Sequence, residues 1–194
     1  MADPHAIDAP SSLTLAQWSE LPEDASGEWV DGRLVEEEEV GFLHDLVVAW
    51  LIRVLGSWAA ERDGVVGASD TRFGVSASRG RKPDVSMYLE GRRPPAHGLV
   101  TTPPDVMIEV VSPRPSDARR DRLEKMAEYA AFGVRFYWVV DPALELVEIF
   151  ELQGDGRYSR AAAAGEGSLD EVPGCPGLTL ELDALWREAR SLPT

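Results

Sequence analysis

The sequence is poor in cysteine, in positive charge and in long apolar runs. Cys175 is the single cysteine in 194 residues, so no internal disulfide can form, which fits a reducing compartment such as the cytoplasm. Residues 1–10 have neither a basic start nor an apolar run, which excludes an ordinary signal peptide. The longest apolar stretch, Leu46 to Leu55, is interrupted by Arg53 and is too short to cross a bilayer. We therefore expect a cytoplasmic protein without membrane association.

Basic residues are outnumbered by acidic ones, 19 against 34, and the net charge of −15 argues against a generic nucleic-acid coat protein. The balance reverses between Arg79 and Lys125, where ten basic residues stand against seven acidic ones. A phosphate-bearing substrate is compatible with this window, although a solvated charged loop would give the same pattern.

The length and the 44% hydrophobic content suit one compact domain with a full core. We expect residues 1–12 to form a flexible tail and residues 13–194 to form a single domain.

The N-terminal half predicts a hairpin and a long helix. Ser12 or Thr14 opens a short helix that ends at Leu21. The run Glu28 to Val35 contains an Asp-Gly pair, which supplies the positive φ angles of a tight hairpin turn. From Gly41 to Arg62 the apolar residues recur at steps of three and four, as in an amphipathic helix.

The remaining segments predict a mixed sheet flanked by helices, an α/β (α+β) fold with an N-terminal hairpin. The basic run 79–82 is interpreted as a turn, and residues 91–104 as a loop. A second amphipathic helix is capped by Ser116, runs to Ala131 and is ended by Gly133. The other predicted elements are strands at Thr71–Ser76, Pro83–Tyr88, Val106–Val111, Arg135–Val140, Leu146–Leu152, Arg157–Ala162 and Leu178–Leu182, and a last helix at Asp183–Ala189.

Two carboxylates occupy unusual positions. Glu109 lies inside the apolar run Val106 to Val111, where a carboxylate is costly to bury unless it is protonated, paired or bound to a cation. Asp84 follows Pro83 at the start of another strand. If the two strands are neighbours, both carboxylates converge at one end of the sheet, an arrangement that Mg²⁺ favours.

The second helix carries a line of polar side chains. Asp121, Lys125 and Tyr129 are spaced four apart, so they share one helix face. A lysine between an acid and a phenol can orient a water or stabilise a phosphate. A salt-bridged surface helix, with Leu123, Met126 and Ala130 as its apolar stripe, would have the same spacing.

Several motifs in order resemble the Uma-two family of restriction endonucleases, within the PD-(D/E)XK nuclease superfamily. The matching stretch runs from about Glu28 to Trp186. The motifs are Pro83-Asp84, Ile108-Glu109-Val110-Val111-Ser112-Pro113, the Asp121, Lys125 and Tyr129 line, Gly133-Val134, Tyr137-Trp138-Val139-Val140-Asp141-Pro142, and the opening hairpin followed by His44.

The resemblance implies an endonuclease that hydrolyses phosphodiester bonds with Mg²⁺ or Mn²⁺, and it favours DNA over RNA. Asp84 and Glu109 are the implied metal ligands, together with the backbone carbonyl of Val110. Val111 stands where the superfamily motif has a lysine, and Lys125 is the implied replacement.

Other residues are interpreted through the same resemblance. His44 takes a position where the superfamily often has an acid, although a histidine at the rim of an apolar stripe is more often structural. Glu28 is either a hairpin residue or a residue lining the site. Asp121 and Tyr129 are expected to support the ligands. Arg81, Arg93 and Arg119 are expected to follow a nucleic-acid backbone.

Two other classes of function remain open. One is a nuclease fold that acts only through protein or nucleic-acid interaction, and the other is a hydrolase of small phosphate esters. Many nucleases of the superfamily act as dimers, so the resemblance also implies a homodimer.

Overall fold

The computed structural model describes residues 12–22, 25, 27–35, 41–112 and 120–193. The helices are α1 (Leu15–Ser19), α2 (Phe42–Ala60), the π-helix η1 (Arg120–Lys125), α4 (Met126–Phe132) and α5 (Leu182–Ala189). The strands are β1 (Glu28–Val30), β2 (Arg33–Val35), β3 (Val65–Ala68), β4 (Phe73–Ser76), β5 (Arg79–Arg81), β6 (Val85–Tyr88), β7 (Val106–Val110), β8 (Phe136–Asp141), β9 (Leu146–Leu152), β10 (Tyr158–Ala164), β11 (Ser168–Leu169) and β12 (Leu180–Glu181).

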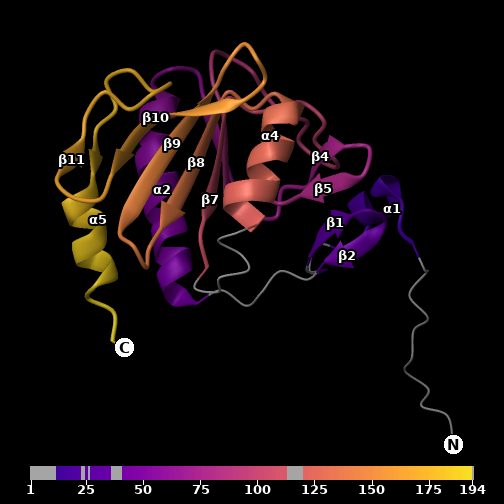
Figure 1. The fold of residues 1–194 in the computed structure, drawn as a ribbon, viewed down its shortest axis with the longest axis horizontal. Helices are drawn as coiled ribbons and strands as arrows, with labels where there is room; N and C mark the ends of the chain where they lie inside the picture. Colours follow the sequence, from indigo (N-terminus) through magenta and orange to yellow (C-terminus); the bar gives the residue numbers. More distant parts are fainter. Residues whose placement is uncertain (1–11, 23–24, 26, 36–40, 113–119, 194) are drawn as a thin grey trace, which may run out of the picture.

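A six-stranded mixed sheet forms the centre of the molecule (Figure 1). Its strand order is β10-β9-β8-β7-β6-β3. Strands β7 and β8 pair in parallel, and the other neighbours pair antiparallel. A parallel pair needs a crossover connection, and the chain segment carrying η1 and α4 supplies it. The predicted mixed sheet flanked by helices is thus confirmed.

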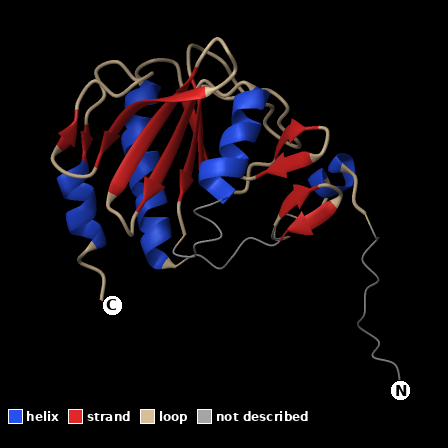
Figure 2. Ribbon diagram, viewed as in Figure 1, coloured by secondary structure: helices blue, strands red, loops and turns tan. Residues whose placement is uncertain are grey.

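Helices cover both faces of this sheet (Figure 2). Because strand residues alternate between faces, Ile108 joins the core beneath α2 and α5, whereas Met107 joins the core beneath α4. Glu109 shares the alternation of Met107, so its side chain belongs to the α4 face.

A smaller sheet of four strands, ordered β2-β1-β5-β4, lies beside α4 (Figure 1). The predicted hairpin between β1 and β2 is confirmed, with Asp31 at φ 49° and Gly32 at φ 83° in its turn. Thr14 caps α1 in a capping box with Gln17, as one of the two predicted caps.

The structure corrects the interpretation of residues 79–82. Arg79–Arg81 forms strand β5, which pairs with β1 and β4, and the turn lies before it. Gly80 has a packing role, because a Cβ there would overlap the ring of Trp18 on α1.

The second helix also differs from its prediction. Its expected cap, Ser116, lies outside the described residues. The described part begins with the π-helix η1, and α4 ends at Gly133, whose φ of 95° confirms the predicted left-handed stop. Leu123, predicted to belong to an apolar stripe, is 61% exposed. The buried face of this helix is instead the polar one, formed by Asp121, Lys125 and Tyr129.

Smaller differences concern the ends of the chain and helix α2. The predicted strand Leu178–Leu182 is reduced to β12, which pairs with the unpredicted β11. Helix α2, with 19 residues, is long and apolar enough to cross a membrane by length and composition. The short apolar stretch from Leu46 to Leu55 was therefore not enough to exclude a membrane-spanning helix from the sequence. Val47, Leu51 and Leu55 of α2 are fully buried in the core, and this packing accounts for their apolar character.

Candidate functional site

Asp84, directly before β6, and Glu109, in the antiparallel neighbour β7, lie at the same end of the sheet. Val85 of β6 pairs with Ile108 of β7, and continuing this register by one residue places Asp84 opposite Glu109. An Asp84 carboxylate oxygen accepts a hydrogen bond of 2.7 Å from the backbone N–H of Val110. The charge of Asp84 also contributes to raising the pKa of Glu109. The predicted convergence of the two carboxylates is therefore present.

Both oxygens of the Glu109 carboxylate have donors. The hydroxyl of Tyr129 donates to Oε1 at 2.6 Å, and the ammonium of Lys125 lies 2.9 Å from Oε2. Glu109 is 3% exposed and lies within a strand that is buried along its whole length. Strand β7, the π-helix η1 and helix α4 together fix the orientation of this carboxylate.

Lys125 is shared among three carboxylates. Its Nζ lies 2.9 Å from Glu109, 3.3 Å from Glu28 and 3.5 Å from Asp121. All four residues are buried, so these charges interact with little screening by solvent. The arrangement excludes the salt-bridged surface helix that the spacing had left open.

Burial and neighbouring charges shift the pKa values in this cluster. Burial is the largest cause of a pKa for Glu109 well above its ordinary value, and Lys125 offsets it only in part. Burial lowers the pKa of Lys125, but the carboxylates, Glu109 first, raise it well above its ordinary value. For Glu28, burial raises the pKa, but the charges of Lys125 and Arg81 outweigh burial and the net shift is downward. The cluster therefore carries an excess of acidic groups over its one ammonium.

His44, in the first turn of α2, contacts the other side of Asp84. Its Nε2 lies 3.3 Å from Asp84 Oδ2, and its Nδ1 lies 3.6 Å from Asp45. Burial lowers the pKa of His44, but hydrogen bonds and charge from Asp84 and Asp45 raise it overall. The histidine is thus a direct neighbour of a predicted ligand.

Tyr137 has a site contact that the sequence interpretation missed. It lies in the buried strand β8 and is itself fully buried, but its hydroxyl donates to the backbone carbonyl of Asp121 at 3.0 Å. A π-helix has unusual backbone hydrogen bonding, and such turns occur frequently at functional sites. A tyrosine inside a buried strand, which needs a partner for its hydroxyl, was the available signal.

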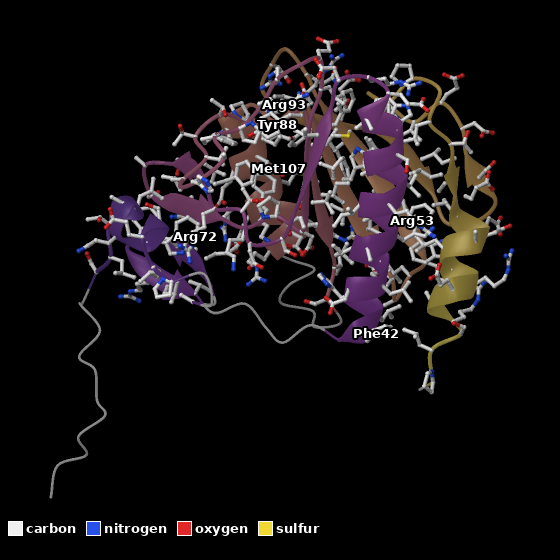
Figure 3. All side chains as sticks on the ribbon, turned by 180° about the vertical axis from the view of Figure 1, so that it is seen from behind. Phe42, Arg53, Arg72, Tyr88, Arg93 and Met107 are labelled. Atoms are coloured by element: carbon white, nitrogen blue, oxygen red, sulfur yellow. The ribbon has the colours of Figure 1, made fainter. Side chains whose placement is uncertain are left out.

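Two of the three arginines expected to follow a nucleic-acid backbone are paired with carboxylates. Arg81 is 1% exposed and cannot reach a phosphate, because it is bonded to Glu28 and Glu128. Arg93 is paired with Asp63 at 2.5 Å. Figure 3 places Arg93 at the opposite end of the molecule from Phe42, the first residue of α2, which precedes His44 by two residues. Arg119 lies outside the described residues.

The carboxylates fit a small hard cation. Sites for Mg²⁺ commonly use one or two carboxylates and retain several waters, and Asp84 and Glu109 supply such a pair. Within the described ranges no group of three or more His, Cys, Asp or Glu side chains is arranged to hold a metal ion, unlike a zinc or calcium cage. The proposed contribution of the Val110 carbonyl stays a prediction.

Cys175 lies apart from this cluster. It is fully buried, and burial raises the pKa of its thiol to about 12, so the thiol stays protonated near neutral pH.

Comparisons with known proteins agree with this fold. The Uma2 family model, described as "Putative restriction endonuclease", matches residues 14–183. A crystal structure of "a putative nuclease belonging to DUF820" from Anabaena variabilis ATCC 29413 superposes with a TM-score of 0.71. The two sequences are 20% identical, and the match covers 91% of this chain and 99% of the other. No curated protein matches.

Proposed function

This chain belongs to the Uma2 family, and on that premise we propose that it is a Mg²⁺- or Mn²⁺-dependent endonuclease that hydrolyses phosphodiester bonds of DNA. The family and the fold are those of restriction-endonuclease-like nucleases, whose substrates are nucleic acids. The observation that carries the proposal is the buried Glu109 carboxylate, held by Tyr129 and Lys125 beside Asp84.

Asp84 and Glu109, with the carbonyl of Val110, would hold the cation. A divalent cation bound there supplies charge stabilisation to a phosphate and acidifies a water. His44 and the N–H of Val110 fix the Asp84 carboxylate, and Tyr129 fixes that of Glu109. These contacts keep the pair in one geometry before substrate arrives.

Lys125 would act on the reacting phosphate. Its ammonium remains protonated in its acidic surroundings, and to donate to a phosphate or a water it would release one of its three carboxylate contacts. From its place beside Glu109 it can orient a water or stabilise the negative charge that develops on the phosphate oxygens. Asp121 and Glu28 keep the ammonium near Glu109 rather than in solvent.

Three further proposals concern the nucleic acid, the location and the oligomeric state. DNA is preferred over RNA on the basis of the family description. A cytoplasmic location suits a chain whose single cysteine is free and buried. A homodimer is proposed from the habits of related nucleases.

The test is cleavage of plasmid, single-stranded DNA and RNA by the purified protein with Mn²⁺ or Mg²⁺. We expect cutting of DNA that is lost in Asp84→Asn and in Glu109→Gln, because each change removes a ligand charge while keeping the side-chain volume. Asp63→Asn, which changes an exposed carboxylate paired with Arg93, is the matched control and should cut normally.

Cutting that persists in both site variants would come from a contaminant and would contradict the proposal. Tight binding of DNA without cutting would favour the interaction module instead. Hydrolysis of a small phosphate ester, with DNA left intact, would favour the third class.

A further inference from the structure

A buried arginine connects the small sheet to helix α4 behind the candidate site. Arg81 of β5 donates from Nε and Nη2 to the two carboxylate oxygens of Glu128, at 2.6 and 2.8 Å. Its Nη1 donates to Glu28 Oε2 at 2.6 Å. The guanidinium therefore forms a two-point contact with α4 and a single contact with β1, a geometry that lysine cannot reproduce.

Glu28 links Arg81 to Lys125 in the candidate site. Its second oxygen, Oε1, accepts the N–H of Lys82 at 3.1 Å and lies 3.3 Å from Nζ of Lys125. One carboxylate thus has one oxygen on Arg81 and the other beside the ammonium that contacts Glu109. Glu128 and Tyr129 are consecutive residues of α4, so both ends of this chain of contacts return to the same helix.

Neither substrate binding nor stability explains the arrangement well. Arg81 and Glu28 are each 1% exposed, so a substrate cannot touch them. Buried ion pairs are often no more stabilising than apolar side chains of similar size, because desolvation of the charges costs as much as their attraction returns. What the network provides is a fixed position for the carboxylate that holds Lys125.

We propose that Arg81 and Glu128 are positioning residues, which hold Glu28 so that the ammonium of Lys125 stays at its place beside Glu109. This inference rests on the proposed nuclease function for its effect on catalysis, but the position of Lys125 can be measured without any activity. The role differs from that of a phosphate-binding arginine, because it acts on turnover and leaves substrate affinity unchanged.

The kinetic test compares Arg81→Met, Arg81→Lys and Glu128→Gln with the wild type in Mn²⁺-dependent DNA cleavage. We expect Arg81→Met to lower kcat by about 10–100-fold, as changes to residues that orient site groups commonly do. The KM for DNA should stay within about twofold, because no substrate contact is removed. Arg81→Lys keeps the charge but cannot form the two-point contact with Glu128, and it should retain more activity than Arg81→Met. A raised KM with an unchanged kcat would overturn the inference.

The matched control is Arg92→Met. Arg92 also contacts a carboxylate, that of Asp105, at 2.6 Å, but it does so at the other end of β6 and β7. This variant should keep the wild-type kcat. A comparable loss in the control would indicate a general effect of removing an arginine and would overturn the assignment.

The second readout is the nuclear magnetic resonance signal of the Lys125 ammonium in ¹⁵N-labelled protein. The chain has two lysines, Lys82 and Lys125, so Lys82→Arg assigns the signals. We expect the Lys125 signal to shift in Arg81→Met and in Glu128→Gln, and to stay in place in Arg92→Met. An unshifted signal in folded Arg81→Met or Glu128→Gln protein overturns the inference. If the wild type cuts no nucleic acid, the proposed function fails, and the Lys125 signal still decides the positioning role.

Discussion

At the scale of single residues, Lys125 is the buried charge on which the neighbouring carboxylates depend for compensation. It is the ammonium shared by Glu28, Glu109 and Asp121, all of them buried. Removing one partner from a buried charge cluster leaves the others uncompensated, which typically costs more than the interaction itself contributed.

We predict that Lys125→Met lowers the free energy of unfolding by about 3–5 kcal/mol, as expected for an uncompensated buried charge. The same variant should lose DNA turnover while keeping its affinity for Mn²⁺, because no ligand is removed and the local negative charge increases. Chemical denaturation, calorimetric titration with Mn²⁺ and DNA cleavage measure the three quantities. Parallel losses of turnover and Mn²⁺ affinity would contradict the assigned role.

At the scale of elements, strand β5 determines how the small sheet meets the rest of the molecule. Arg79 and Arg81 point to α4 on one face, where both bond Glu128. Gly80 lies on the other face, against the ring of Trp18. The alternation of a strand thus assigns ion pairs to one side and close packing to the other.

We predict that Gly80→Ala destabilises the protein by about 1–3 kcal/mol, because the added methyl group overpacks the contact with Trp18. Gly154→Ala is the matched control, since a Cβ at residue 154 meets nothing within 4 Å. Urea unfolding of both variants gives the comparison. Equal stability of the two would mean that α1 does not pack on Gly80 as described.

The elements also show what could be predicted from the sequence. The Asp31-Gly32 turn and the stop at Gly133 could be predicted, because a local backbone requirement fixes each of them. Glu109 could be singled out because it interrupts an apolar run. Strand β5 could not be recognised, since the partners that bury Arg81 are Glu28 and Glu128, about fifty residues away on either side.

The buried face of the second helix could not be predicted from local patterns either. Spacing placed Asp121, Lys125 and Tyr129 on one face, which is correct, but it could not say that this face is buried. The π-helix and the exposure of Leu123 follow from packing against the sheet, where Glu109 and Tyr137 bind the helix. Tertiary contacts decided between two interpretations that the sequence left open.

At the scale of the whole molecule, positive charge is mostly committed to internal pairs. Arg79, Arg81, Arg92 and Arg93 each contact a carboxylate, and the net charge is −15. Within the part of the chain that the structure describes, these arginines are therefore less available to replace the counterions of DNA.

We predict that, without a divalent cation, the protein binds duplex DNA weakly and with a shallow salt dependence, a log–log slope smaller than about 2 in magnitude. Adding Mg²⁺ or Mn²⁺ at constant ionic strength should strengthen binding, because the carboxylates of the site then no longer repel the phosphate. Fluorescence anisotropy of a labelled duplex measures both effects. A steep slope in the absence of divalent cations would mean that many basic side chains bind phosphates despite these ion pairs, and it would contradict the prediction.

Glu28 comes from the N-terminal hairpin, whereas the ammonium that it holds comes from a helix in the second half of the chain. Parts of a protein that open locally do so as cooperative units, and a hairpin of this kind is one such unit. A molecule in which the hairpin has opened would keep most of its central sheet but would lose the contact between Glu28 and Lys125. On the proposed function, molecules with an undocked hairpin would then lack full cleavage activity although their central sheet is intact.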